Sequence, residues 1–143
     1  MTREAAYVAL FALLGGLKTA GQVRICDRRV RLLEEMAVSE LPALFMVVDH
    51  QQMVQQKGLP SRRTLGAKLF LYAANPDRHT PAGIVLNGLL DAVETALLPP
   101  PPADTQTLGG QVAHAWIDGP IEVFEGPLGE RAAAILTVHM LVP

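Results

Sequence analysis

The last quarter of the chain constrains the fold most, because it predicts two β-strands joined by a short loop. The first strand is expected over 112–124, interrupted at Asp118-Gly119-Pro120, and the second over 131–142. The segment 125–130 between them contains the glycines and proline typical of a turn. Strands joined by so short a connection pair antiparallel, so the chain is expected to end in a long hairpin. Such a hairpin suits pairing and assembly, and it carries no feature of a catalytic loop.

The first part of the chain predicts an amphipathic helix. Thr2 can cap it, and Glu4 places a negative charge in its first turn. Gly15-Gly16 is expected to end it. Its apolar face is formed by residues at i, i+3, i+4 and i+7, namely Tyr7, Leu10, Phe11 and Leu14.

A second amphipathic helix is predicted after residue 80. Thr80 is expected as its N-cap and Pro81 as its first helical residue. The four consecutive prolines over 99–102 end it and form a stiff connector. The apolar face consists of Leu86, Leu89, Leu90, Val93 and Leu97, and the solvent face of Asn87, Asp91 and Glu94.

Strands are predicted over 23–27, 42–48 and 64–73. The third alternates, with Leu65, Ala67, Leu69 and Leu71 on one face and Lys68, Phe70 and Tyr72 on the other. The stretch 28–36 is compatible with a helical turn or an extended segment. Together these elements predict a single α+β domain over 1–143, an α/β sandwich whose mostly antiparallel or mixed sheet carries both helices on one face.

Composition favours burial between subunits. Half of the 143 residues are hydrophobic, only 18% are charged, and the mean hydropathy is +0.25. These values are apolar for a soluble monomer of this size, and one explanation is that part of the apolar surface is buried between copies. The net charge of −2 does not indicate that the domain as a whole binds nucleic acid.

The N-terminal apolar stretch 5–17 has the length of a signal-peptide core, but Glu4 precedes it and no small-residue cleavage site follows. It is too short to span a bilayer. With a single cysteine, Cys26, the chain cannot form an internal disulfide, which fits a reducing compartment. The Cys26 side chain is expected to be packed within the fold. We therefore expect a cytosolic protein without a membrane partner.

No catalytic or metal-binding pattern is present in the sequence. The histidines (His50, His79, His114 and His139) have no metal-ligand spacing. His114 and His139 are expected on the two C-terminal strands, either facing each other as a cross-strand pair or as two unrelated, partly buried residues. Neither serine, Ser39 or Ser61, lies in a nucleophile elbow. The neighbours Glu34 and Glu35 indicate a solvated face. We predict a protein that is not an enzyme and has no metal or cofactor.

Two polar segments are the candidate interaction residues. One is the basic cluster Arg24, Arg28, Arg29 and Arg31, to which Arg62 and Arg63 could add. It indicates a solvated strand and turn, a salt-bridge surface toward another subunit or partner, or the rim of a pore that contacts DNA phosphates. The other, 50–57, contains Gln51, Gln52, Gln55 and Gln56, and indicates a polar strand extension that reaches a neighbour or an ordinary hairpin tip.

Several short motifs, taken in order, resemble the tail terminator (tail completion) proteins of long-tailed bacteriophages and prophages. The resemblance covers nearly the whole chain, and the combination of motifs is more specific than any one of them. The motifs are Ala5-Ala6-Tyr7, Arg28-Arg29, Leu41-Pro42-Ala43-Leu44-Phe45, Gly58-Leu59-Pro60, Leu71-Tyr72, Leu89-Leu90-Asp91-Ala92-Val93-Glu94, Thr107-Leu108-Gly109-Gly110, Trp116-Ile117-Asp118-Gly119 and Leu141-Val142-Pro143.

This resemblance implies a structural virion protein that forms a hexameric ring. The ring would cap the tail tube, stop its polymerisation and present a surface to the head–tail connector. Its partners would be further copies of itself, the tube protein, connector proteins and DNA in the lumen, in the virion and, during assembly, in the host cytoplasm. The alternatives are a head–tail joining (neck) protein, a small cytosolic binding module with a pocket near Trp116, and, least favoured, an enzyme.

Overall fold

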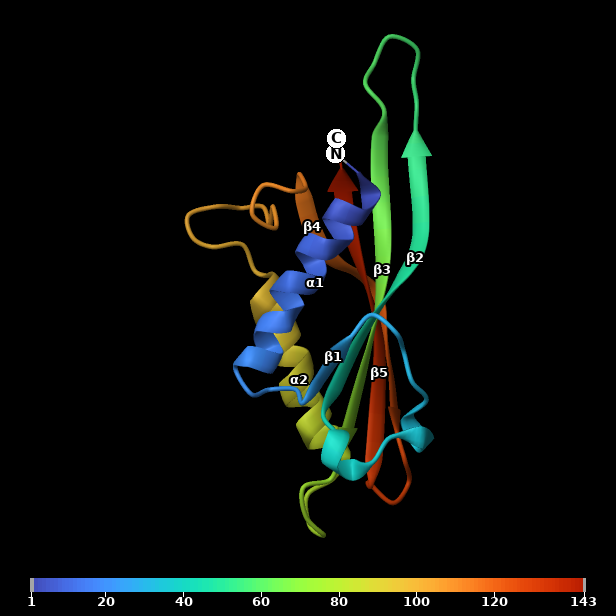
Figure 1. Ribbon diagram of the computed structural model, residues 1–143, viewed down its shortest axis with the longest axis vertical. Coiled ribbons are helices and arrows are strands. Elements are labelled where there is room, and N and C mark those ends of the chain that lie inside the picture. Colours follow the sequence, from blue (N-terminus) through green and yellow to red (C-terminus); the bar gives the residue numbers. More distant parts are fainter. Residues whose placement is uncertain (1, 143) are drawn as a thin grey trace.

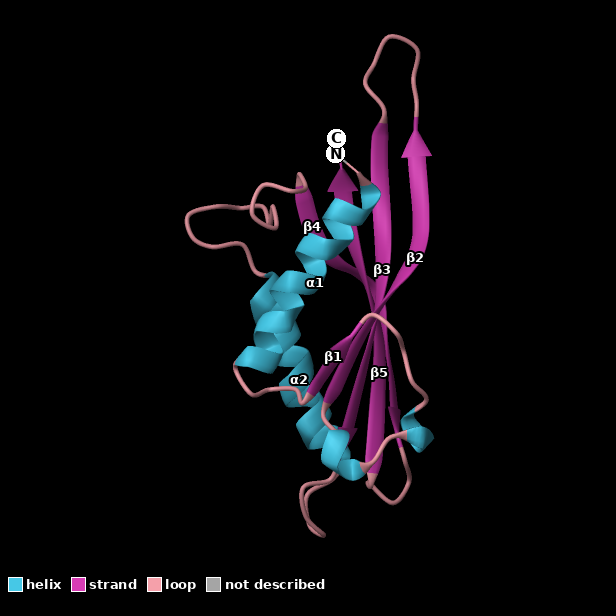
Figure 2. Cartoon of the chain, viewed as in Figure 1, coloured by secondary structure: helices cyan, strands magenta, loops and turns pink. Residues whose placement is uncertain are grey.

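The computed structural model describes residues 2–142, which form a sheet with two helices packed on one of its faces (Figures 1 and 2). The described residues contain five strands in the order β1-β2-β3-β5-β4; β1 and β2 are parallel and the other neighbours antiparallel. The predicted α+β fold class is therefore confirmed. The elements are α1 (Arg3–Thr19), β1 (Ile25–Asp27), η1 (Leu33–Glu35), η2 (Val38–Glu40), β2 (Ala43–Val54), β3 (Arg62–Ala74), α2 (Ala82–Leu97), β4 (His114–Glu125) and β5 (Arg131–Val142).

The main core lies between the sheet and the helices. Alternate residues of β3 face it, as predicted, and Leu65, Ala67, Leu69 and Leu71 are almost fully buried there. The same alternation runs along β5, where every second residue from Ala132 to Val142 is buried. The period-2 pattern thus places one face of each central strand against the helices.

Both helices depart from the sequence prediction at one end. α1 does not stop at Gly15-Gly16 but continues to Thr19, because Leu14 and Leu17 on either side of the glycines are both buried in the core. Packing therefore outweighs the low helix propensity of glycine. At α2, Pro81 rather than Thr80 is the N-cap residue, and its side chain makes no capping hydrogen bond.

Thr80 is held instead by Asp77 in the loop before α2. The Asp77 carboxylate accepts hydrogen bonds from the backbone N–H groups of His79 (2.8 Å) and Thr80 (2.9 Å). These bonds, the one from His79 first, lower the pKa of Asp77. The aspartate orders the turn by bonding to backbone groups two and three residues later, a common arrangement in loops.

The segment 28–42 covers the lower part of the outer sheet face, on the side away from the helices (Figure 1). Met36 and Leu41 pack there against Phe45 and Tyr72 in a second, smaller core. The Tyr72 hydroxyl donates to the carbonyl of Arg31 at 2.8 Å. The ambiguous stretch 28–36 is thus an extended cover with one short 3-10 turn, η1.

Two irregularities curve the sheet. The β2–β3 register shifts between Val48 and Gln51, so that Asp49 and His50 lie opposite Gly66. The β4–β5 register shifts between Asp118 and Glu122, at the predicted interruption of the strand. Such bulges bend a strand and increase its twist. Beyond the first bulge, β2 and β3 continue as a hairpin that projects past the helices (Figure 1).

Candidate interaction surfaces

The predicted basic cluster is bound within its own chain at three of its four arginines, Arg24, Arg28 and Arg31. The Arg24 guanidinium donates to the carbonyl of Ser39 at 2.8 Å. Arg31 donates to both carboxylate oxygens of Glu40, at 2.7 and 3.2 Å, and the backbone N–H of Ala37 donates to the same carboxylate at 2.9 Å. These bonds, that of Arg31 first, lower the pKa of Glu40.

Arg28 and Gln51, both predicted interaction residues, meet at Tyr7 on α1. Arg28 forms an ion pair with Glu4 and lies over the Tyr7 ring, 5.9 Å from its centroid. The Gln51 amide donates to the Tyr7 hydroxyl at 3.2 Å. Burial is the main cause of a raised pKa for the Tyr7 phenol. The structure therefore joins two separate predicted segments through one aromatic side chain.

Arg29 lies at the rim of a shallow depression beside Asp27 and Glu35, with a volume of about 420 Å³. Its backbone N–H points toward the Asp27 carboxylate at 3.4 Å. The side chain is exposed, so a role toward another subunit or toward DNA stays a prediction.

The remaining predicted residues lie on the projecting β2–β3 hairpin, which we call the arm (residues 51–63). Gln51 and Gln52 continue β2 and pair with Leu65 and Thr64, so the glutamine-rich stretch begins as a strand extension. Gln55 donates to the hydroxyl of Ser61 at 3.1 Å. Gln56 and Arg62 line a small depression near the end of the arm.

The arm is both basic and apolar at its surface. It carries Lys57, Arg62 and Arg63 and contains no aspartate or glutamate. Met53, Val54 and Leu59 are exposed, with 62% of the Leu59 surface accessible. Exposed apolar side chains gathered with charges of one sign are typical of an interaction surface.

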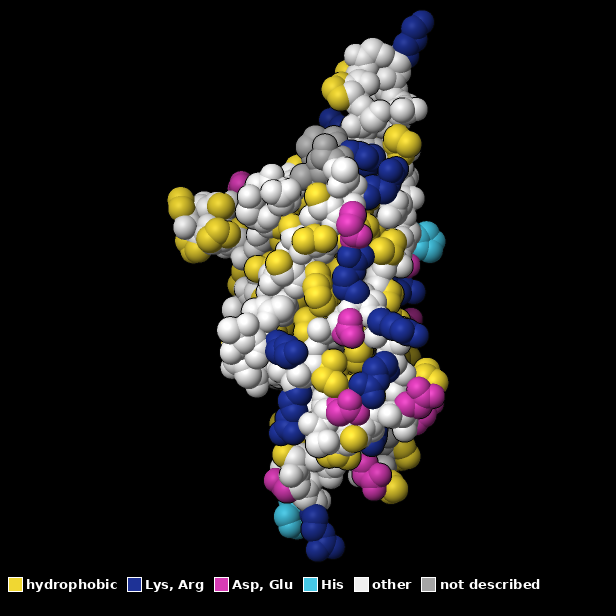
Figure 3. Space-filling model, viewed as in Figure 1, with side chains coloured by type: hydrophobic (Ala, Val, Ile, Leu, Met, Phe, Trp, Pro, Cys, Tyr) yellow, Lys and Arg dark blue, Asp and Glu magenta, His cyan; other side chains and the backbone are white. Residues whose placement is uncertain are grey.

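At the opposite end of the molecule, beside the loop that holds the exposed Arg78, one segment carries the reverse charge. We call the end of β4 and the loop that follows it the acidic tip (residues 122–130); it holds Glu122, Glu125 and Glu130 and no lysine or arginine. Phe124 and Leu128 are exposed there, Leu128 to 83%. The arm and this tip lie at opposite ends of the long axis (Figure 1), and Figure 3 shows apolar and charged side chains side by side along it.

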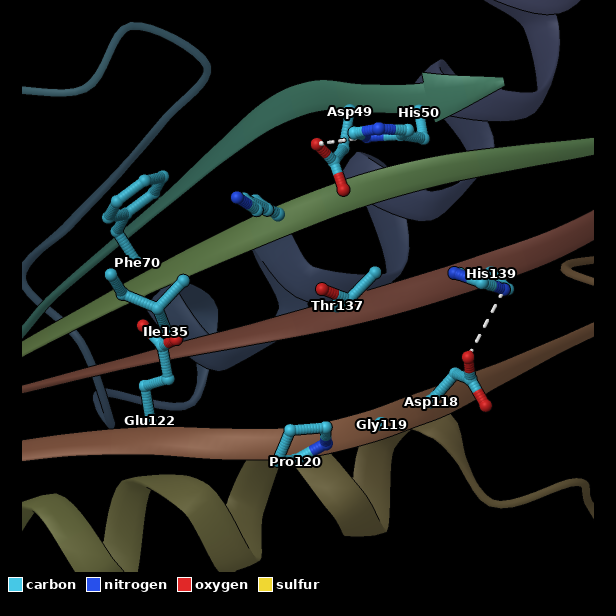
Figure 4. Close-up of a pocket in the computed structure, with 11 residues that line it drawn as sticks. Asp49, His50, Phe70, Asp118, Gly119, Pro120, Glu122, Ile135, Thr137 and His139 are labelled. Carbon is cyan, nitrogen blue, oxygen red and sulfur yellow. Dashed lines mark hydrogen bonds and ion pairs between the residues drawn. The ribbon is translucent and has the colours of Figure 1, made fainter. Parts of the chain in front are cut away.

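A groove of about 470 Å³ crosses the outer sheet face between the two bulges (Figure 4). Phe70 and Ile135 contribute apolar surface to it. Its carboxylates come from Asp49, Asp118 and Glu122, against the single lysine Lys68. Asp118 lies 3.5 Å from His139 and Asp49 lies 3.3 Å from His50. The charged side chains that line the groove are thus mostly acidic.

The two C-terminal histidines do not face each other. The β4–β5 register places His139 opposite Trp116 and His114 opposite Leu141. The Trp116 ring lies between them, stacked on His114 with centroids 5.3 Å apart and edge-on to His139 at 5.7 Å. His114 also accepts a hydrogen bond from the backbone N–H of Gln106 at 3.0 Å. The register therefore excludes the cross-strand pair, and the two histidines are separate, half-buried residues, which was the other expectation.

Within residues 2–142, no group of three or more histidine, cysteine, aspartate or glutamate side chains is arranged to hold a metal ion. None of the helices described is long and apolar enough to cross a membrane. Cys26 is half-buried, and burial raises the pKa of its thiol.

The acidic tip was not predicted from the sequence. Its three glutamates, within a segment that has no lysine or arginine, are the signal that could have indicated it.

Comparison with known proteins adds no relative, since no family model matches the sequence and no curated protein matches it.

Proposed function

We propose that this protein is a structural component of a long-tailed phage or prophage tail, acting as a tail terminator does. Copies of the chain form a ring that sits on the last ring of the tail tube. The ring halts tube polymerisation and presents a surface to the head–tail connector. The sequence resemblance set out above leads to this proposal, and the arm is the structural observation that carries it.

The arm supports assembly because its backbone edge is open. β1 pairs with β2 only at residues 43–45, and the far side of β2 beyond them has no strand partner among the described residues. An open edge with exposed apolar side chains is a ready template for pairing with another chain. In a soluble monomer the same feature favours aggregation.

In this proposal the predicted cations divide into two groups. Arg24, Arg28 and Arg31 stabilise the fold through Ser39, Glu4 and Glu40. Arg29 and Arg62 are exposed and would face the tube, the connector or DNA in the lumen. The protein would act in the virion and assemble in the host cytoplasm, without catalysis and without a cofactor.

The decisive test is disruption of the coding gene, followed by particle production and electron microscopy. Headless tubes of uncontrolled length are expected, because nothing then stops tube growth. Tails of normal length that lack heads would assign the chain to head–tail joining instead. A genome without other tail genes, or normal particles, would contradict both roles.

A second candidate is a small binding module that uses the groove of Figure 4, because this groove combines apolar surface with carboxylates in one concave site. The groove is not lined by Trp116, near which the sequence prediction had placed the pocket. A thermal-shift screen of small cationic and aromatic compounds tests it. A compound that raises Tm in the wild type, but not in a Phe70→Ala variant, would favour this function. No shift with any compound would count against it.

A further inference from the structure

We propose that the arm of one copy docks on the acidic tip of the next copy, so that the ring is closed by a basic-to-acidic, head-to-tail contact. This inference rests on the proposed ring and names the surfaces that form it. The occupant of both surfaces is a second copy of this chain.

Charge complementarity is the first argument. Lys57 and Arg62 are exposed on the arm, which holds no carboxylate. Glu122 and Glu130 are exposed at the acidic tip, which holds no basic residue. Complementary patches steer encounter and fix the register of two partners. Because both patches belong to one chain, every copy brings them in equal number.

Glu125 belongs to the same tip but has a role within the chain. A Cβ atom placed on Gly83 would lie 2.3 Å from its carboxylate, which shows that Glu125 packs against the first turn of α2. A negative charge there is favoured by the helix dipole. The intermolecular contact is therefore assigned to Glu122 and Glu130.

Apolar surface is the second argument. Met53, Val54 and Leu59 are exposed on the arm, and Val123, Phe124 and Leu128 at the tip. Each set lies in a segment whose own charged residues have one sign, and exposed apolar side chains in such a segment are typical of an interaction surface. If the arm of one copy packed against the tip of the next, both sets of apolar side chains would be removed from water.

Geometry is the third argument. The arm and the tip lie at opposite ends of the long axis (Figure 1). β4 is the last strand of the sheet order, so its outer edge has no strand partner among the described residues, and the same holds for the edge of β2 in the arm. Two different surfaces at opposite ends produce a heterologous contact, which closes into a ring when the rotation between copies allows it.

The test uses two double charge reversals of the full chain, K57E/R62E and E122K/E130K. Light scattering over a concentration series should show that the wild type self-associates and that added salt weakens the association. Each variant alone should associate about tenfold or more weakly, because like charges then meet. An equimolar mixture should regain association, since each variant supplies the surface that the other lacks.

The matched controls are K18E and D91K, which reverse exposed charges outside both surfaces and should associate like the wild type. Thermal melting of every variant shows whether it is folded. The contact is overturned if either double variant associates normally, if the folded variants fail to rescue each other, or if the wild type is monomeric at all concentrations.

Failure of the contact and failure of the proposed function are distinguishable. If both charge-reversal variants still form rings, the contact between the arm and the acidic tip is overturned, while the proposed ring is retained. Open filaments that the reversals abolish would support the contact while contradicting a closed ring. If K57E/R62E associates normally but no longer binds duplex DNA, the arm is a DNA-binding surface. That outcome would overturn the contact with a second copy.

Discussion

The hydroxyl of Tyr7 on α1 donates a hydrogen bond to the carbonyl oxygen of Gly66 in β3, 2.7 Å away in the buried interior. Gly66 lies where the β2–β3 register shifts, opposite Asp49 and His50. The first helix therefore binds the sheet at the bulge from which the arm departs. Because Gln51 and Arg28 also contact Tyr7, one side chain links the helix, the arm and the basic segment.

Replacing Tyr7 with phenylalanine should lower the free energy of unfolding by about 1–3 kcal/mol, because the buried Gly66 carbonyl loses its side-chain partner. Urea denaturation measures the loss. Gln51→Ala, which removes an exposed side chain from the same hydroxyl, is the control and should cost less than about 0.5 kcal/mol. Equal costs for the two variants would show that the buried bond is not the stabilising one.

Gly66 should tolerate no side chain. A Cβ atom there would lie 2.6 Å from the carbonyl oxygen of His50, a backbone atom that cannot turn aside. Gly66→Ala should destabilise the fold by about 1–3 kcal/mol. The control is Gly88→Ala in the exposed middle of α2, where nothing lies within 4 Å of the added atom.

Gly88→Ala should instead stabilise the protein by up to about 1 kcal/mol, since alanine has the higher helix propensity. Chemical denaturation of both variants gives the two signs. A Gly66→Ala variant as stable as the wild type would mean that the bulge relaxes without cost.

Periodic elements could be predicted from the sequence, and the reason is physical. Each pattern arises because one face of the element is buried in the main core. In β3 the alternating residues are Leu65, Ala67, Leu69 and Leu71, and in α2 the residues at helical spacing are Leu86, Leu89, Val93 and Leu97. Glycine and proline marked the C-terminal hairpin loop for a similar local reason. These patterns sufficed for the fold class.

Features that depend on distant partners could not be predicted. The path of 28–42 across the outer sheet face shows no periodicity, because hydrogen bonds from Tyr72 and Arg131, far along the chain, hold it to the sheet. The candidate surfaces were predicted in part: the arm's glutamines and arginines stand out in sequence. Its complement, the acidic tip, becomes a surface only once β4 is known to be an edge strand.

Arg131 should hold the segment 28–42 in place. Its guanidinium donates to the carbonyls of Leu33 (2.6 Å) and Met36 (2.8 Å). Arg131→Met removes both charge-assisted bonds, each worth about 1.5–3 kcal/mol. Local opening should rise by about tenfold or more, and trypsin should cut at Arg28, Arg29 and Arg31 correspondingly faster.

Mass spectrometry of a timed digest measures the rate of those cuts. Arg78→Met, in the exposed loop before α2, is the matched control and should leave the rate unchanged. If Arg131→Met is cut no faster than the control, the packing of Met36 and Leu41 alone holds the segment.

The Cys26 thiol should react slowly in the native protein. It is half-buried, and burial, the main cause, raises its pKa above the ordinary value of 9.0, so less thiolate is present at a given pH. Labelling with iodoacetamide near neutral pH should be slow until denaturant is added. A native rate equal to that of the denatured chain would contradict the burial of this side chain.

Acid should weaken the fold partly through Glu40. Its folded-state pKa lies below the ordinary 4.5, first because of Arg31, so the unfolded chain binds the proton more readily. The contribution to stability is therefore present above about pH 4.5 and is lost as the pH falls through the folded pKa. Glu40→Gln should show a shallower fall of Tm between about pH 5 and pH 3. Glu94→Gln, an exposed control on α2, should follow the wild-type curve, and identical curves for all three proteins would remove Glu40 from the acid response.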